Sequence, residues 1–593
     1  MTEKGHPVDE PGLPVGQSRL SGLNALFLRH EWLRGYSLLS PILLLIICAL
    51  ALPVFTLVLY SFWTQDYVTI DKTFTVANYT SFFEKWIYGK LLFRSIMLSA
   101  MVTVTTIVLA YPVAYFLAFR VKKNVMMWLI LINLPFWTSY LLRVLAWKIM
   151  LGNSGVINSS LLEFGFIQAP LEFLLYSRFA VILTLVHAWA AFAILPIYLS
   201  LSKIDRSLLE AAADLGERPV STFLRVTLPL SMPGVIAAAV IQFIPTVGDY
   251  VTPTMVGGPK GIMIGQIIAA QFGEANNIPL GSALTIIMMI TITTIALTFV
   301  WLMQRGTIKK REMETVVVST ESSRSTKGRP NLLFIYVVLY LLFLYIPSLM
   351  LPVFSFNDSI QMVLPLKGFT LKWYAGIANT PGLLTALGNS FKVALPVALV
   401  STSLATIAAK SLTRYRIPGR GLVMGFILLP MVMPGIILAV GLLVLALAVG
   451  MPLSLWTIGI AHVLATLPFS MLIVMARLEG FSKSIEEAAL DLGENGWMMF
   501  WRVTFPLILP GVAAAFLLSF TASFDEFLFA LFLGGNHVTL PVFMFTQTRF
   551  PQTLPTVLAL GSCIFLGSAL LLGTAEWLRR SGGPSSRSTN SGE

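Results

Sequence analysis

Acidic residues interrupt two long apolar stretches of this sequence, and they are the first candidates for chemistry. Asp249 lies in the first half, and the adjacent pair Asp525 and Glu526 lies in the second. A charge at the middle of a bilayer costs at least about 2.5 kcal/mol, so such residues usually face a polar cavity. Converging carboxylates would suit a di- or polycation, and the rings of Trp137 and Tyr140 would each add about 0.5–2 kcal/mol.

Other interpretations of the same residues stay open. The acids would instead cap helices or lie at a wet helix end, and the two aromatic residues would pack or form an interfacial belt. Arg143 and Lys148 lie close to the aromatic pair in the sequence. They would either neutralise the acids or belong to a site for an anionic ligand.

Enzymatic and metal chemistry find little support. Cys48 and Cys563 lie far apart in apolar stretches, and the five His residues are scattered singly. Such a pattern favours neither a disulfide nor a metal site. Because we find no convergent nucleophile or acid–base pair either, we expect no catalytic residues and no metal on this chain.

A polar block that occurs twice relates the two halves of the chain. Residues 210–234 read EAAADLGERPVSTFLRVTLPLSMPG, and residues 487–511 read EAALDLGENGWMMFWRVTFPLILPG. The copies align without a gap at an offset of 277, with 15 of 25 positions identical, and the same offset relates Asp249 to Glu526. Two equivalent halves that each present one surface are the simplest explanation.

Each block has the pattern of a helix, a glycine stop and a second short helix. Good helix formers precede Gly216, which stands where a left-handed helix stop is needed, and Pro219 suits the first turn of the next helix. Such an element can act as a rigid lever whose alanines allow a partner to approach closely and whose glutamate offers a carboxylate. The residues assigned to this surface are Glu210, Ala211, Ala212, Gly216 and Pro229 in the first copy, and Glu487, Ala488, Ala489, Gly493 and Pro506 in the second.

The composition predicts the elements that must position these residues. The 593 residues are 56% apolar and 11% charged, against roughly 25% charged residues in soluble domains. We therefore expect an all-α membrane protein with about 12 transmembrane helices, since each needs about 20 apolar residues. The expected spans are residues 37–62, 91–119, 125–151, 179–201, 231–251 and 280–303 in the first half, and 332–354, 387–409, 422–449, 456–475, 509–533 and 554–577 in the second.

The basic residues predict orientation rather than nucleic-acid binding. With the N-terminus inside, 28 of the 40 Lys and Arg fall in cytoplasmic segments, as the positive-inside rule requires. This orientation puts both termini and both polar blocks in the cytoplasm and makes the halves parallel six-span repeats. The expected divisions are a cytoplasmic segment 1–36, a first membrane domain 37–303, a cytoplasmic linker 304–330, a second membrane domain 331–578 and a cytoplasmic tail 579–593.

The repeated block resembles the signature loop of permease subunits of bacterial ATP-binding-cassette importers. That signature reads EAA, three residues, Gly, nine residues, an aliphatic residue, one more, then Leu-Pro; the second copy departs from it only with Phe505 in place of Leu. The resemblance implies the type I importer permease fold in the bacterial inner membrane. It also implies two ATPase subunits, one on each block, and a periplasmic substrate-binding protein. As no GxxxxGK[ST] motif occurs in the chain, ATP and Mg²⁺ would be used by the partner ATPase and no cofactor by this chain.

Further stretches are similar to the spermidine/putrescine permease pair. Residues 134–158 and 248–272 look like one subunit, and residues 429–445, 485–493, 520–535 and 538–549 look like the other. This likeness implies polyamine import. Permeases for ferric iron, phosphonates, thiamine or opines share the patterns, and a fused two-half chain is common in the ferric-iron type. A twelve-span secondary transporter is an alternative of another class, against which the two blocks argue.

Overall fold

The structure is a computed structural model that describes residues 30–67, 69–311, 332–363 and 365–581. It is almost entirely helical, as expected, and the strands of the described residues form one hairpin in which Thr64–Asp66 (β1) pairs antiparallel with Thr69–Asp71 (β2). In the first half the helices that lie outside the repeated block are α2 Glu31–Ile46, η1 Ile47–Ala51, α3 Leu52–Ser61, α4 Ala77–Glu84, α5 Trp86–Phe119, α6 Val125–Asn133, η2 Leu134–Trp137, α7 Tyr140–Leu151, α8 Val156–Glu163, η3 Glu172–Leu174, α9 Arg178–Leu201, η5 Pro253–Gly257, α13 Ile264–Phe272 and α14 Ile278–Arg311.

The second half repeats this order. Its helices outside the repeated block are α15 Leu332–Ser355, α16 Lys372–Ile377, α17 Leu383–Arg414, α18 Arg420–Val432, α19 Gly435–Ala448, α20 Leu455–Glu479, α24 Leu528–Leu533, α25 Leu540–Gln547 and α26 Leu554–Ser581. The repeated blocks and the spans that follow them comprise α10 Arg206–Asp214, α11 Pro219–Thr222, η4 Phe223–Thr227 and α12 Leu228–Val247, and then α21 Ser484–Asp491, α22 Gly496–Met499, η6 Phe500–Thr504 and α23 Phe505–Asp525.

Apolar helices occur at each of the twelve expected spans. Within the described residues, nine helices are long and apolar enough to cross a membrane, and two bent helix pairs raise the number to eleven. The shorter apolar helix Leu554–Gly567 coincides with the start of the twelfth expected span. The first eight residues of the expected linker continue α14, whereas residues 312–330 of it, residues 1–29 and residues 582–593 lie outside the described part of the chain.

The third span of each half is broken, which corrects the continuous spans expected over 125–151 and 422–449. The chain bends by 73° between α6–η2 and α7, and by 97° between α18 and α19. Thr138 and Met433 take extended ψ angles of 145° and 142° at the two breaks. Because Pro434 follows Met433 and disfavours a helical conformation there, the second break has a local cause.

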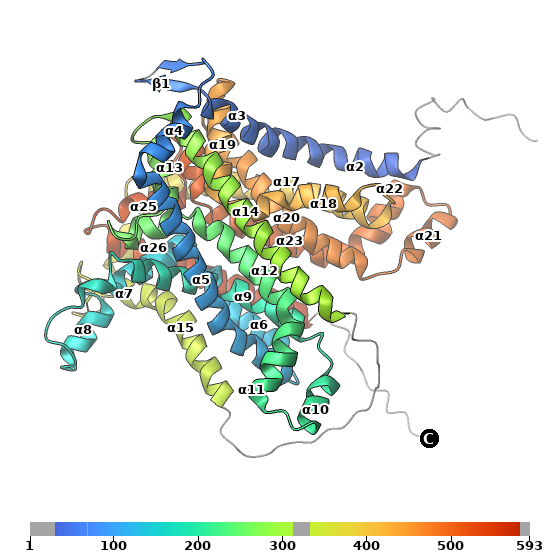
Figure 1. The fold of residues 1–593 in the computed structure, drawn as a ribbon, viewed down its shortest axis with the longest axis horizontal. Helices are drawn as coiled ribbons and strands as arrows, with labels where there is room; N and C mark the ends of the chain where they lie inside the picture. Colours follow the sequence, from blue (N-terminus) through green and yellow to red (C-terminus); the bar gives the residue numbers. More distant parts are fainter. Residues whose placement is uncertain (1–29, 68, 312–331, 364, 582–593) are drawn as a thin grey trace, which may run out of the picture.

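The first helices of each half reach across to the other half, although α3 also packs on α14 and α15 on α26 of their own halves. Helices α2 and α3 of the first half pack along α17 and α19 of the second, while α15 of the second half packs on α5 and α7 of the first (Figure 1). Tyr36 of α2 donates a hydrogen bond to the Pro418 carbonyl at 2.7 Å, and Tyr336 of α15 donates one to the Leu109 carbonyl at 2.7 Å. The halves are therefore interlocked rather than merely adjacent.

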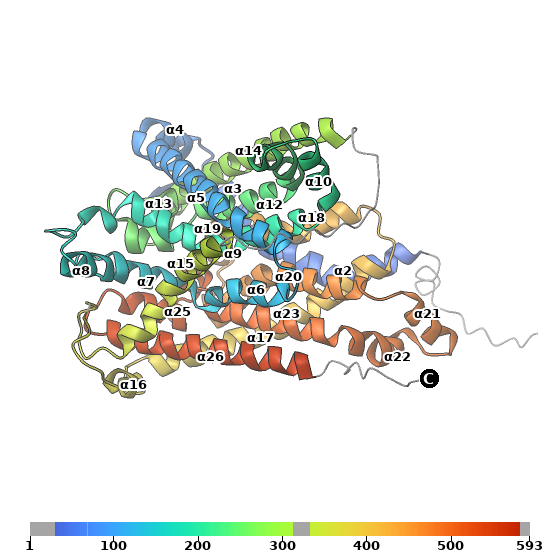
Figure 2. The ribbon, with the colours of Figure 1, turned by 90° about the horizontal axis from the view of Figure 1, so that it is seen from below.

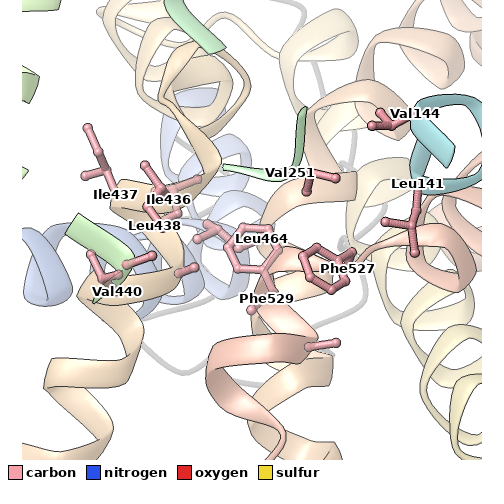
Figure 3. Packing of buried hydrophobic residues seen from close by; sticks show 14 of the residues in the cluster. Leu141, Val144, Val251, Ile436, Ile437, Leu438, Val440, Leu464, Phe527 and Phe529 are labelled. Atoms are coloured by element: carbon pink, nitrogen blue, oxygen red, sulfur yellow. The ribbon is translucent and has the colours of Figure 1, made fainter. Parts of the chain in front are cut away.

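Apolar side chains from both halves meet at the centre (Figure 3). Leu141 of α7, Ile436 of α19 and Phe527 near the start of α24 belong to one buried cluster. Gly248 allows a close approach between the halves, since a Cβ there would lie 2.7 Å from Cβ of Pro434. Where lipid surrounds a protein, such tight packing of small residues replaces the hydrophobic effect as the force that joins helices.

The two polar repeated blocks lie apart from each other. Figure 1 shows α10 and α11 at the lower edge of the molecule and α21 and α22 at its right edge, and Figure 2 shows α4, α8 and α16 on the opposite side from α10, α21 and α22. The long helices of each half lead to the block of that half, so they hold the two blocks at separate places.

Candidate functional site

A cavity of about 390 Å³ lies between the halves at the two broken spans. It receives Tyr140 and Arg143 from α7, Asp249 from the segment after α12, and Asp525 and Glu526 from the end of α23. Four of the five residues that the sequence proposed for ligand binding therefore share one cavity. The fifth, Trp137, ends η2, and its side chain lies outside the described part of the structure.

Tyr140 connects the carboxylates of the two halves. Its hydroxyl donates to Oδ2 of Asp249 at 3.0 Å and also lies 2.6 Å from Oγ1 of Thr252. Its backbone N–H donates to Oδ2 of Asp525 at 3.0 Å. One residue at the start of α7 thus holds an acid from each half, which the sequence did not indicate.

Asp249 and Glu526 lie at helix breaks, which corrects their expected place inside the spans 231–251 and 509–533. Helix α12 ends at Val247, two residues before Asp249, and α23 ends at Asp525, directly before Glu526. Asp249 accepts backbone N–H bonds from Val251 at 3.2 Å and Thr252 at 3.3 Å. Glu526 accepts them from the N-terminus of α24, namely from Leu528, Phe529 and Ala530 at 2.9, 2.8 and 3.4 Å. The acids therefore cap helical turns, which was one of the two interpretations of the sequence, and they also line the cavity, which was the other.

Arg143 supplies a positive charge to the same cavity. Only 6% of its surface is exposed, and it interacts electrostatically with Asp525. Its guanidinium lies 4.8 Å from the ring centre of Phe136, and its Nε and Nη1 have no hydrogen-bond partner within the described residues. This arrangement agrees with the neutralising role among the sequence-based alternatives and leaves donors free beside the acids.

His462 is a neighbour of the acids that sequence reasoning missed. Its Nε2 lies 3.2 Å from Oε2 of Glu526, and its Nδ1 is hydrogen-bonded to Oγ of Ser523 at 2.7 Å. His462 stands 64 positions before Glu526. No local pattern joins residues at such a distance, so only the packing of α20 against α23 reveals the contact. Within the described residues, no group of three or more His, Cys, Asp or Glu could hold a metal ion.

Each repeated block, which we call the first and second repeat loop (210–234 and 487–511), turns at its glycine. Gly216 has φ +79° and Gly493 has φ +92°, and no other atom lies within 4 Å of the position of a Cβ at either one. The left-handed conformation predicted at both is confirmed, and backbone conformation rather than space demands glycine. The predicted start of a second short helix at Pro219 is also confirmed.

An ion pair braces each repeat loop at matching positions. Nη1 of Arg225 lies 2.8 Å from Oε1 of Glu217, and Nη1 of Arg502 lies 2.6 Å from Oε1 of Glu494. Each pair joins the residue after the glycine to the π-helical turn η4 or η6. Pairs this exposed contribute about 0–1 kcal/mol. The repetition of Glu and Arg at the same spacing in both copies was the sequence signal that could have revealed them.

The repeat loops expose apolar side chains as well as their glutamates. Leu215 is 85% exposed and Leu492 is 87% exposed, and both immediately precede the loop glycines. The side chains of Glu210 and Glu487 are exposed, whereas Ala212 is buried and Ala489 is half-buried. The side chains of Leu224, Trp497 and Trp501 are also exposed. Exposed large apolar side chains on each of these two polar loops favour a protein partner.

Comparisons with known proteins agree with this division into two similar halves. The model of the family described as binding-protein-dependent transport system inner membrane component matches residues 33–309 and 401–581. The chain is 36% identical over 255 residues to the spermidine/putrescine transport system permease protein PotB of Escherichia coli (strain K12), covering 43% of this chain and 92% of PotB. It is 34% identical over 239 residues to PotC of the same strain, covering 40% of this chain and 90% of PotC.

A solved structure gives a weaker likeness. It is described as the crystal structure of a bacterial ABC transporter involved in the import of the acidic polysaccharide alginate. The match has 18% identity and a TM-score of 0.38, and it covers 48% of this chain and 99% of that chain, which is too weak to carry an argument. The family matches, by contrast, cover most of the sequence and include both repeat loops. The chain therefore belongs to the family of binding-protein-dependent transport system inner membrane components, and it is an ABC importer permease with both halves in one polypeptide.

Proposed function

We propose that this permease imports polyamines such as putrescine and spermidine. The observation that carries the proposal is the cavity between the halves. Tyr140 is hydrogen-bonded there to Asp249 and Asp525, and Glu526 lines the same cavity. Three carboxyl groups face one guanidinium there, which favours a solute with more than one positive charge. The similarity to PotB and PotC, which are named as spermidine/putrescine permeases, supports the same class of solute.

The repeat loops serve, in this proposal, as the docking surfaces for ATPase subunits. Each loop combines a glycine-stopped helix, an exposed glutamate and an exposed leucine, and each continues through a π-helical turn into a membrane helix. Since the chain has two such loops, one copy would assemble with two ATPase subunits, which would bind the ATP and Mg²⁺. A periplasmic substrate-binding protein would deliver the solute at the opposite end, with both termini of the chain in the cytoplasm.

Uptake by cells tests the solute class. Cells lacking other polyamine importers would receive this permease with its ATPase and binding protein, and uptake of radiolabelled putrescine and spermidine would be measured. Asp249→Asn and Glu526→Gln keep the shape of each side chain and remove its charge. We expect either substitution to slow uptake by roughly tenfold, equivalent to 1.4 kcal/mol of lost stabilisation in transit.

Capture of the solute by the binding protein should stay unchanged in both variants, because that protein sets the affinity. Immunoblots of the membranes would confirm equal insertion. Absence of amine uptake by the unmodified permease would reject the polyamine proposal in favour of ferric iron, a phosphonate, thiamine or an opine. Normal uptake by both variants would reduce the acids to helix caps.

A further inference from the structure

A buried ion pair fastens the docking helix of the second repeat loop to the membrane helices. Nε of Arg414, at the end of α17, lies 2.8 Å from Oε2 of Glu486 on α21, and their side chains are only 9% and 6% exposed. The other carboxylate oxygen, Oε1 of Glu486, accepts a hydrogen bond from Oγ1 of Thr504 at 2.6 Å. Thr504 ends η6, directly before α23. One carboxylate therefore joins α21, α17 and the base of α23.

Neighbouring contacts extend this cluster. Nη2 of Arg414 donates to the Leu478 carbonyl of α20 at 3.1 Å, and the guanidinium lies 4.7 Å from the ring centre of Phe481. Nζ of Lys410, one turn earlier on α17, lies 4.5 Å from the ring centre of Phe500 in η6. We call Lys410, Arg414, Glu486 and Thr504 the ionic hub. It touches three membrane helices and the docking helix at once.

The first half carries apolar and aromatic residues at three of the four corresponding places, and only the threonine is kept, as Thr227. At the offset of 277, Glu486 corresponds to Leu209. Ser95 of α5 and Ser390 of α17 accept equivalent backbone N–H bonds from Ile264 and Leu540. Aligning α5 and α17 on these serines sets Tyr115 opposite Lys410 and Phe119 opposite Arg414. The first docking helix is instead linked to α5 by a hydrogen bond of 3.3 Å from the exposed Arg206 to the Ala118 carbonyl.

This difference has a mechanical consequence. A buried ion pair is weak evidence for stability, because desolvation offsets the attraction and apolar residues often do as well. The pair does fix the distance and the relative orientation of the two helices it joins, since each buried charge must keep its partner. A contact made of apolar side chains can slide without such a penalty.

We propose that the ionic hub makes the second repeat loop the stiff transmission element of this importer, while the first loop stays compliant. Glu486 and Arg414 are positioning residues that hold α21 against α17 and α23 so that these helices move together. The inference rests on the proposed docking of ATPase subunits on the two loops. It adds that the two loops transmit motion unequally.

Spin labels can compare the two loops within one complex. The two native cysteines are exposed and are first removed by Cys48→Ser and Cys563→Ser. One pair of spin labels is then attached to cysteines that replace Leu490 of α21 and Leu399 of α17, which are both exposed. The matched pair in the first half replaces Ala213 of α10 and Val104 of α5, which are exposed as well. Distances would be measured in the complex with ATPase and binding protein, before and after trapping with ATP and vanadate.

We expect a narrow distance distribution in the second half that trapping leaves in place, and a broader one in the first half that shifts. The variant Lys410→Tyr/Arg414→Phe/Glu486→Leu gives the second half the residues of the first, and its distribution should broaden and shift likewise. The charge exchange Arg414→Glu/Glu486→Arg should recover a narrow distribution. Equal behaviour of the two halves in the unmodified chain, or no response to the triple replacement, would overturn the proposal.

Transport coupling provides the readout that a purely structural role would not change. With putrescine as the probe, uptake per ATP hydrolysed should fall roughly 2- to 30-fold in the triple variant. Removing the exposed pair Arg420–Glu479 with Arg420→Gln/Glu479→Gln is the control and should leave that ratio unchanged. Loss of thermal stability with a normal ratio would contradict the hub's role in transmission.

Docking is tested separately with the variant Glu210→Arg/Glu487→Arg. If this variant still co-purifies with the ATPase at the normal level, the docking proposal fails, while the distance measurements still test the stiffness of the second loop.

Discussion

Tyr140 shows how one residue can organise a pathway between two halves. Its hydroxyl donates a hydrogen bond to Asp249 in its own half, and its backbone N–H donates one to Asp525 in the other half. The sequence identified these acids because charged residues in apolar stretches are rare. It could not identify Tyr140 as their common partner, because its bonds reach 109 and 385 positions along the chain. The glycine stops at Gly216 and Gly493, by contrast, are local features, and their conformation was predictable.

Arg143 offers a test of charge balance in the cavity. Arg143→Gln leaves Asp525 without its facing cation, and an uncompensated carboxylate at bilayer depth costs about 2.5–3.5 kcal/mol. We expect lower thermal stability of the purified permease and slower amine uptake. Asp525→Asn in the same chain should restore much of the stability, because it removes the uncompensated charge. A single Arg143→Gln variant as stable as the unmodified chain would show that the two charges do not depend on each other.

The broken third span is the element whose form the sequence understated. Apolar residues continue through both breaks, so composition predicts one long span in each half. The break at Pro434 has a local cue in its proline, yet proline also occurs inside α5, α9 and α20 without such a bend. At the second break Pro434 lies against Gly248 of the other half, and no local sequence pattern records a contact over such a distance along the chain. The helices of the repeat loops, each bounded by local cap and stop residues, were predicted well.

Substitution of the loop glycines tests the lever at the scale of the element. A β-branched residue is disfavoured at positive φ, where any non-glycine residue loses about 1–2 kcal/mol. We expect Gly216→Val and Gly493→Val to lower uptake without abolishing ATP hydrolysis, with the larger effect at Gly493 because the second loop carries the ionic hub. Gly419→Val is the matched control. It has φ +68° and open space, but it lies between α17 and α18.

The control separates backbone strain from coupling. All three variants should lose similar stability in a thermal unfolding assay, whereas Gly419→Val should keep its normal ratio of uptake to hydrolysis. Equal uptake per ATP in the loop variants and the control would refute the lever interpretation.

The whole molecule contains both halves of a permease in interlocked form. The first helices of each half pack on both halves, so neither half packs completely alone. The sequence predicted two six-span repeats from the repeated block and the charge bias. The packing of the first helices on the opposite half was not predictable. The helices α2 and α15 are apolar on most sides, and their sequences hold no pattern that indicates which helix they contact.

Stoichiometry tests the assembly at this scale. One chain with two repeat loops should bind two ATPase subunits. Native mass spectrometry of the detergent-extracted complex should therefore give one permease to two ATPases. A variant with both loop glutamates reversed, Glu210→Arg/Glu487→Arg, should lose bound ATPase. A stable core of two permeases and two ATPases would contradict the assignment of one docking surface to each loop.

ATP-dependent uptake in proteoliposomes tests the central claim most directly. The vesicles would contain this chain and its ATPase as the only membrane components, with the binding protein outside and ATP and Mg²⁺ inside. We predict concentrative uptake of labelled spermidine or putrescine, dependent on ATP hydrolysis and reduced by Asp249→Asn. Uptake of neither amine by vesicles that hydrolyse ATP in response to the loaded binding protein would contradict the account of one chain forming a polyamine pathway.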